Sequence, residues 1–199
     1  TGIERPVEKS AAPIKDEYGK VKGVVIVFRD FSEKKSKQDK IEYLSYHDQL
    51  TGLYNRRFFE EELIRLDTER NLPISLIMAD VNGLKLTNDA FGHTLGDKLL
   101  KAAADTIKNE CRSDDIISRI GGDEFVIVLP KTSNMESKSI VQRIEASARN
   151  QKVNSVELSI SFGCHTKDDP DEKMENVFKK AEDNMYRVKL FQSPSMRSN

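Results

Sequence analysis

Residues 116–129 read IISRIGGDEFVIVL, and this stretch decides how the rest of the chain is interpreted. Two runs of β-branched residues flank Gly121 and Gly122, and Asp123 and Glu124 follow directly. Ile and Val favour a half-buried pleated surface, and a glycine pair between two such runs is typical of a tight hairpin. We therefore predict a β-hairpin with two carboxylates at its turn. These residues alone leave two interpretations open, a solvated turn and a metal site at the edge of a sheet.

A third acidic residue follows another predicted strand. Residues 74–79, ISLIMA, form an almost continuous apolar run, which is typical of a buried central strand, and Asp80 comes next. Hard divalent cations take oxygen ligands, and Mg²⁺ is usually held by one or two carboxylates together with substrate phosphates. An acid at the end of a buried strand, beside a hairpin with two more acids, therefore favours a phosphoryl-transfer site over a structural hairpin.

The composition is that of a polar but globular chain. It has 199 residues, of which 37% are hydrophobic and 33% charged, and its formal net charge is −1. This balance gives no overall attraction to nucleic acid or anionic lipid, so we predict no nucleic-acid partner. Cys111 and Cys164 form no disulfide framework and no metal-ligand spacing, so we expect a reducing compartment and a cytoplasmic location.

No apolar run approaches the roughly 20 residues that a transmembrane helix needs, so we predict no membrane span in this chain. No signal peptide opens it, and the first residues begin in the middle of a pattern. We expect a fragment of a longer parent protein, which could itself be anchored in a membrane.

Residues 1–31 are predicted to form two strands, near residues 6–14 and 23–31, joined by a turn. The sequence APIKDEYGKVKGVVIVFRDFSEKK resembles the closing hairpin of PAS sensor domains, so this segment is assigned as a partial PAS-like hairpin. Residues 32–47 follow as a charged helical connector. Its narrow apolar stripe, with Ile41 and Leu44, suits a short dimeric coiled coil, and a solvated helix is the alternative.

Strands and helices alternate in the rest of the chain. Residues 134–150 and 173–189 have apolar residues at helical spacing, and residues 81–95 are polar and punctuated by glycine, so a helix is predicted only from Gly96 onward. Residues 155–164 alternate as a strand, with four side chains on one face: Val156, Leu158, Ile160 and Phe162. Since the hairpin is antiparallel, we predict an α+β fold with a mixed, largely antiparallel central sheet flanked by helices.

Three spaced motifs resemble the GGDEF diguanylate cyclase family: Asp48-x-Leu-Thr-Gly-Leu-x-Asn-Arg56, the block from Asp80 to Asp97, and Arg119-x-Gly-Gly-Asp-Glu-Phe125. The resemblance covers about residues 45–190, with the domain assigned to residues 48–190 and a tail at 191–199. It implies a fold like that of nucleotide cyclases and polymerase palms. It also implies an enzyme that condenses two GTP into cyclic di-GMP and two pyrophosphates, with Mg²⁺ or alternatively Mn²⁺ as the cofactor. The other interpretation is a catalytically silent receptor for cyclic di-GMP.

The same resemblance implies roles for individual residues. Asp80, Asp123 and the carbonyl of Val81 would bind the metal, with Glu124 near a second ion. Asp123 would also assist deprotonation of the GTP 3′-hydroxyl. Lys85 would meet the phosphates as a point charge.

Further residues would contact the substrate. Asn88 and Asp97 would recognise guanine, since a carboxylate can accept hydrogen bonds from both N1–H and the exocyclic amine, which adenine does not offer together. Gly121 and Gly122 would leave room for the nucleotide. Lys189 would lie on the phosphates, with a solvated lysine as the alternative.

Arg112-Ser-Asp-Asp115 matches the RxxD inhibitory site of the family, and Arg143 stands where a secondary arginine of that site is often found. Product inhibition by cyclic di-GMP is therefore implied, and the alternative is an exposed ion pair of little energy. The family mechanism also implies a homodimer, since each domain holds one GTP.

The chain departs from the family pattern at two places. Asn82 stands where the family often has aspartate, and LFQSPSMRSN replaces the usual Gly-Arg-Asn after the last helix. The first removes a carboxylate close to Asp80. The second puts one arginine–phosphate contact in doubt.

Overall fold

A computed structural model describes residues 5–192 of the chain, so most of the predicted tail at 191–199 lies outside the described residues. The chain divides into two compact units, with the boundary between Ser45 and Tyr46. Within residues 5–192, no helix has both the length and the apolar character to cross a membrane.

The helices are α1 (Ser32–Tyr46), α2 (Arg56–Leu66), the 3₁₀ helix η1 (Glu69–Asn71), α3 (Leu84–Phe91), α4 (His93–Glu110), α5 (Asn134–Arg149) and α6 (Met174–Gln192). The strands are β1 (Val7–Lys15), β2 (Val21–Asp30), β3 (Tyr54–Asn55), β4 (Ile74–Val81), β5 (Ile116–Arg119), β6 (Glu124–Leu129), β7 (Lys152–Val153), β8 (Val156–Glu157) and β9 (Ile160–Lys167).

The first unit contains two strands joined by a turn, as predicted, and their PAS-like character stays a prediction. β1 and β2 pair antiparallel, and Oδ1 of Asp16 accepts hydrogen bonds from the N–H groups of Tyr18 and Lys20 at 3.0 and 2.9 Å, which closes the turn. The large apolar side chains of both strands are exposed: Val7, Ile14, Val21, Val24, Val25, Ile26, Val27 and Phe28. None of the residues of α1 is buried, and its coiled-coil and solvated interpretations both stay open.

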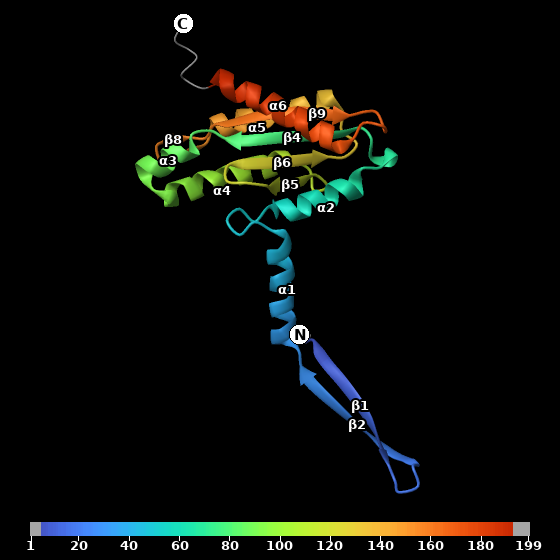
Figure 1. The fold of residues 1–199 in the computed structure, drawn as a ribbon. Helices are drawn as coiled ribbons and strands as arrows, with labels where there is room; N and C mark the ends of the chain where they lie inside the picture. The colour runs from blue at the N-terminus through green and yellow to red at the C-terminus, as the bar shows by residue number, and fades with distance from the viewer. Residues whose placement is uncertain (1–4, 193–199) are drawn as a thin grey trace. The chain divides into compact units, whose positions relative to one another are not determined.

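The second unit is built on a five-stranded sheet in the order β3-β5-β6-β4-β9 (Figure 1). Only the β3–β5 pair is parallel, so the predicted mixed, largely antiparallel sheet is confirmed. β4 lies between β6 and β9, and all eight of its residues are buried, as an apolar run in a central strand requires. Side chains from α4 and α5 pack on one face of the sheet, and side chains from α2 and α6 pack on the other.

The structure corrects two expectations. The segment 81–95 contains a complete helix, α3, and α4 begins at His93 rather than at Gly96. Gly83 and Gly92 flank α3 with positive φ angles of 71° and 82°, conformations that favour glycine, so these glycines are helix boundaries rather than loop markers.

The second correction concerns residues 155–164. They do not form one strand, because the short hairpin β7–β8 ends at Glu157 and β9 begins at Ile160. Leu158, Ile160 and Phe162 nevertheless share one buried cluster, with Val156 packed against it. The alternating pattern therefore predicted the packing correctly and the strand boundaries incorrectly.

Helix α6 approaches β9 closely at one position. A Cβ atom added to Gly163 would overlap the main chain of Met185 and Ala181, and it would lie 2.6 Å from Cα of Met185. Only glycine therefore lets α6 lie at this depth on the sheet.

We predict that Gly163→Ala destabilises the second unit by about 1–3 kcal/mol or more, because the added methyl group must displace main-chain atoms. Thermal or urea unfolding measures the loss. Gly23→Ala is the matched control, since its methyl group would make an ordinary contact of 3.6 Å with Cδ1 of Ile14. Equal stability of the two variants would contradict the close approach.

Candidate active site

Asp80 is the most buried of the acidic residues at the predicted site. It is the penultimate residue of β4 and is 4% exposed. Nζ of Lys189 donates a hydrogen bond to Oδ2 of Asp80 at 2.7 Å, whereas Oδ1 is buried and has no hydrogen-bond partner among the described residues. The protein thus neutralises one oxygen of this carboxylate and leaves the other to a ligand.

Glu124 stands opposite Asp80 in the sheet. β4 and β6 are antiparallel, and their register pairs these two residues. The N–H of Ile120 donates to the carbonyl of Glu124, and the N–H of Val81 donates to the carbonyl of Asp123, both at 3.0 Å. Main-chain hydrogen bonds therefore bring the three predicted acids to one edge of the sheet.

The two glycines of the turn have different surroundings. A Cβ atom on Gly121 would lie 2.8 Å from Oε2 of Glu124, whereas one on Gly122 would have nothing within 4 Å. Gly121 thus makes room for a protein side chain. Gly122 faces open space, which fits the expected approach of a nucleotide.

The carboxylates at this edge disfavour one another's charge. Burial raises the pKa of Glu124, and the negative charges of Asp123 and Asp80 raise it further. Burial also raises the pKa of Asp80; the hydrogen bond from Lys189 opposes this effect, and the charge of Asp123 adds to it. The folded chain therefore concentrates negative charge where a cation would relieve it.

The donor set fits a hard divalent cation. The predicted ligands are carboxylate oxygens and one main-chain carbonyl, and the buried Oδ1 of Asp80 lacks a partner among the described residues. Across residues 5–192, no three His, Cys, Asp or Glu side chains form a complete metal-binding group. These residues would therefore supply only part of a coordination shell.

The residues predicted to contact the nucleotide lie on α3 and α4, directly after β4. Lys85 and Asp97 are exposed, and Asn88 is half-buried. Oδ1 of Asn88 is buried without a hydrogen-bond partner in the described part of the chain. The structure thus places the phosphate-binding and base-recognising candidates on two successive helices that contact each other.

Asn82, which departs from the family pattern, is held by hydrogen bonds to Ser161 in β9 and to Ser159, just before β9. Its Nδ2 donates to Oγ of Ser159 and its Oδ1 accepts from Oγ of Ser161, both at 3.0 Å. An amide can donate and accept at the same time, whereas a carboxylate only accepts. Asn82 therefore joins the end of β4 to the start of β9.

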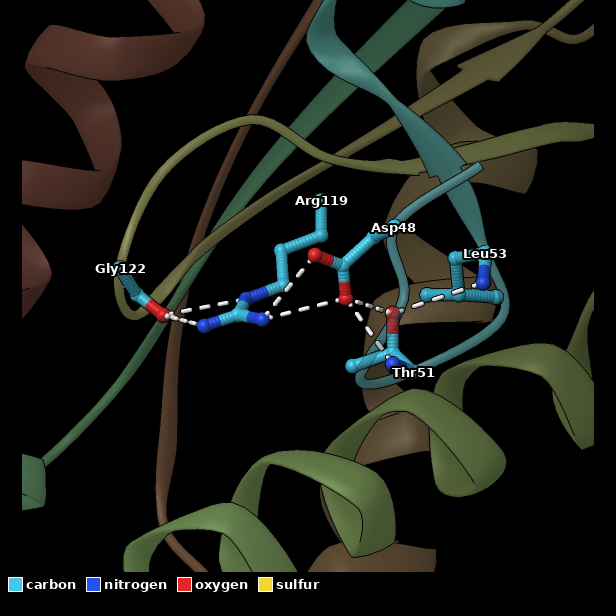
Figure 2. Close-up of polar contacts among 5 residues, drawn as sticks. All are labelled: Asp48, Thr51, Leu53, Arg119 and Gly122. Atoms are coloured by element: carbon cyan, nitrogen blue, oxygen red, sulfur yellow. Dashed lines mark hydrogen bonds and ion pairs between the residues drawn. The ribbon is translucent and has the colours of Figure 1, made fainter. Parts of the chain in front are cut away.

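A further hydrogen-bond network holds the glycine turn, and no role was predicted for its side chains (Figure 2). Nη1 of Arg119 bonds both carboxylate oxygens of Asp48, at 3.1 and 3.2 Å. The same guanidinium donates to the carbonyl of Gly122 from Nη2 at 2.7 Å and from Nε at 3.2 Å. Thr51 donates to Oδ1 of Asp48 from its N–H and its hydroxyl, at 2.9 and 2.7 Å. The loop before β3 is thus tied to the turn that carries Asp123.

Asp48 and Arg119 appeared in the sequence only as motif letters. The available signal was the position of Arg119, at the end of an apolar strand and two residues before a glycine pair. A half-buried arginine at such a place needs an anionic partner. Burial alone would raise the pKa of Asp48, but the hydrogen bonds from Thr51 and Arg119 outweigh it, and the pKa is lowered.

Of the predicted inhibitory residues, Arg112 and Asp115 lie where α4 leads into β5, and Arg143 lies on α5. Oδ2 of Asp115 accepts a hydrogen bond from the N–H of Arg112 at 2.7 Å, while the side chain of Arg112 is exposed. Arg143 donates from Nη2 to the carbonyl of Glu110 at 2.6 Å. Burial raises the pKa of Asp115, and the positive charges of Arg112 and Arg143 oppose that rise. A cavity of about 290 Å³ is lined by Arg112, Asp115 and the neighbouring Tyr54.

Comparison with known proteins gives a match over most of the chain. The family model described as "Diguanylate cyclase, GGDEF domain" matches residues 45–193. Diguanylate cyclase DgcM of Escherichia coli (strain K12) is 32% identical over 193 residues, which cover 94% of this chain. The chain spans 46% of the length of that relative.

Solved structures agree with this match. The GGDEF domain of PA1120 from Pseudomonas aeruginosa is 31% identical, with a TM-score of 0.64 over 73% of this chain and 90% of that one. The coiled coil and GGDEF domain of DgcB from Caulobacter crescentus, solved with c-di-GMP, gives a TM-score of 0.74 at 23% identity, over 80% of this chain and 88% of that one. At that identity the second likeness concerns the fold.

We predict that Asp48→Asn lowers the free energy of unfolding by about 1–3 kcal/mol at pH 7, because Arg119 then loses its charged partner in a half-buried position. Since folding lowers the pKa of Asp48, its stabilising effect is present above the unfolded pKa of about 3.9 and is lost as the pH falls through the folded value. Unfolding measured from pH 7 to pH 3 should therefore show the two proteins converging in acid.

Glu61→Gln is the control for this series. It removes an exposed i,i+4 pair with Arg57, which should contribute little to stability. A loss in Asp48→Asn that stayed constant down to pH 3 would show that charge is not its origin.

Proposed function

The chain belongs to the diguanylate cyclase GGDEF domain family, and on that premise we propose that it condenses two molecules of GTP into one cyclic di-GMP and two pyrophosphates. In each half-reaction a GTP 3′-hydroxyl attacks the α-phosphate of the other GTP. The new P–O bond forms as the bond to the β-phosphate breaks, and the hydroxyl proton is lost.

One observation carries this proposal. The β4–β6 register pairs Asp80 with Glu124 beside Asp123, and a buried oxygen of Asp80 has no partner within the described residues. This arrangement does not serve the stability of the fold, because a buried carboxylate oxygen without a hydrogen-bond partner costs free energy. Phosphoryl transfer requires it, because the reaction develops charge that cations must neutralise.

Asp80, the Val81 carbonyl, Asp123 and Glu124 would hold Mg²⁺, or alternatively Mn²⁺. When bound, the metal supplies Lewis-acid neutralisation of phosphate charge. Asp123 would also accept the proton of the 3′-hydroxyl. Lys85 would contact the phosphates.

Lys189 has two roles in this proposal. Its ammonium lies on Oδ2 of Asp80 at 2.7 Å, where it offsets the carboxylate charge within the protein. With substrate present, the flexible side chain would move to the phosphates, whose charge is larger than that of one carboxylate.

The remaining residues would select and position the base. Asn88 and Asp97 would recognise guanine. Gly122 would let the nucleotide approach the turn directly, and Gly121 would do so by leaving room for the side chain of Glu124. Since one domain holds one GTP, the product would form only in a homodimer that brings two sites face to face.

Regulation is proposed for two further parts of the chain. Arg112, Asp115 and Arg143 would bind cyclic di-GMP as an inhibitor, supported by the exposed guanidinium of Arg112 and by the cavity beside it. The hairpin β1–β2 would be the end of a PAS-like sensor domain in a cytoplasmic part of the protein, and α1 would connect it to the cyclase.

We predict that the chain, incubated with GTP and Mg²⁺ under continuous product removal, forms cyclic di-GMP. Asp123→Ala should lower the turnover by on the order of 10²-fold or more, because it removes a proton acceptor and a metal ligand together. The same variant should still bind cyclic di-GMP, which isothermal titration calorimetry measures. Asp105→Ala, an exposed acid on α4, is the control and should keep full turnover.

Two outcomes would contradict this function. A chain that binds cyclic di-GMP but forms none at high protein concentration would be a silent receptor. A turnover per protein that does not change with concentration, in a chain that sediments as a monomer, would exclude catalysis between two copies.

We predict that Arg112→Ala weakens inhibition by cyclic di-GMP by at least about 10-fold, because it removes a charge-assisted contact to phosphate or guanine. Initial rates at increasing product concentration measure the effect. Arg149→Ala, which removes an exposed partner of Glu145 on α5, is the control and should be inhibited like the original chain. Equal inhibition of both variants would remove Arg112 from the inhibitory site.

A further inference from the structure

Helices α3 and α4 meet closely at one pair of residues. Gly96 is a buried residue of α4, and a Cβ atom added to it would overlap Oδ1 of Asn88 on α3 and lie 2.9 Å from Cγ of Asn88. It would also lie 3.2 Å from Cδ1 of Leu84. The amide of Asn88 thus fills the volume that any side chain at position 96 would need.

The oxygen of this amide is held by packing rather than by a hydrogen bond. Oδ1 of Asn88 is buried and has no hydrogen-bond partner in the described part of the chain. A buried polar atom without a partner normally costs stability, so a native protein keeps one where it serves a ligand or a constraint. Gly96 supplies the constraint, because its bare Cα leaves the space in which the amide lies.

Gly96 differs from Gly163 in the kind of atom that a methyl group would meet. At Gly163 the obstacle to a methyl group is main chain, which cannot move without shifting a helix. At Gly96 the first obstacle is the end of a flexible side chain, which can rotate away. A methyl group at position 96 would therefore be accommodated largely by Asn88, with little effect on the fold.

We propose that Gly96 is the positioning residue that fixes the Asn88 amide for guanine, and that it thereby determines selectivity for GTP over ATP. The inference rests on the proposed function, in which Asn88 and Asp97 recognise the base. Gly96 directly precedes Asp97 in α4. The same turn of this helix would therefore carry the Asp97 carboxylate and, at Gly96, the space that positions the Asn88 amide. Selectivity of this kind is strong, because a base that cannot pair leaves polar groups unsatisfied.

Gly96→Ala tests the proposal. The variant should bind GTP on the order of 10-fold more weakly, the effect expected when one hydrogen bond to the base is lost, while its affinity for ATP stays within about twofold. In turnover assays KM for GTP should rise and kcat should change little, because the reacting groups are untouched. Its melting temperature should be unchanged or higher, since alanine favours a helix interior over glycine. Gly163→Ala, by contrast, should lose melting temperature and keep the GTP-to-ATP preference of its folded fraction.

A double-mutant cycle with Asn88→Ala identifies the route of the effect. If Gly96 acts through Asn88, adding Gly96→Ala to Asn88→Ala should change GTP affinity by less than about twofold. If the single variant Gly96→Ala melts early, the double variant should recover, because the amide that meets the methyl group is gone.

Three results would overturn the proposal. The first is a GTP-selective original chain whose Gly96→Ala variant is equally selective. The second is a Gly96→Ala effect on GTP affinity that is just as large in the Asn88→Ala background. The third is an early-melting Gly96→Ala variant whose stability does not recover in the double variant. An original chain with no preference for GTP would overturn the proposed function itself, and this inference with it.

Discussion

The active site depends on the register of one strand pair. β4 pairs with β6 from Ser75 opposite Leu129 to Asp80 opposite Glu124, and both strands are buried along almost their whole length. Since side chains alternate between the two faces of a sheet, a slip of one residue would exchange the side chains of β4 between its two buried faces and separate the paired acids. The packing of the core therefore fixes the geometry of the acids. The same apolar residues that make the sheet stable also determine where its charges meet.

Two groups of carboxylates in this domain have opposite environments. Asp48 accepts hydrogen bonds from Thr51 and Arg119, and its pKa is lowered, so its charge stabilises the fold at neutral pH. Asp80 is buried and Glu124 is half-buried, both near other acids, and their pKa values are raised, so their charges oppose folding at neutral pH. The guanidinium of Arg119 connects the two groups through the carbonyl of Gly122. Asp48, whose carboxylate is hydrogen-bonded, thus helps to hold the turn that leads into Glu124.

The sequence predicted the sheet, the hairpin and the acid at the end of β4 correctly, because each is encoded by neighbouring residues. Apolar runs and a glycine pair are local signals, and the side-chain period of two is regular. Helix α3 was missed because it spans only eight residues between two glycines, which also mark turns. The role of Arg119 was missed because Asp48 lies 71 residues away in the chain, and the contact exists only after β3 pairs with β5. The site residues on α3 and α4 were named from family resemblance, and the sequence could not show that Gly96 touches Asn88.

The hairpin of the first unit has a consequence for the behaviour of the chain in solution. Residues 24–28, VVIVF, are five consecutive β-forming residues with exposed side chains, on a two-stranded ribbon in which both strands are edges. Exposed apolar edges favour intermolecular strand pairing and aggregation, and flanking charges such as those of Lys22 and Arg29 oppose it. A higher protein concentration would therefore favour the cross-β association of two hairpins, in addition to the encounter of two cyclase domains that the proposed mechanism requires.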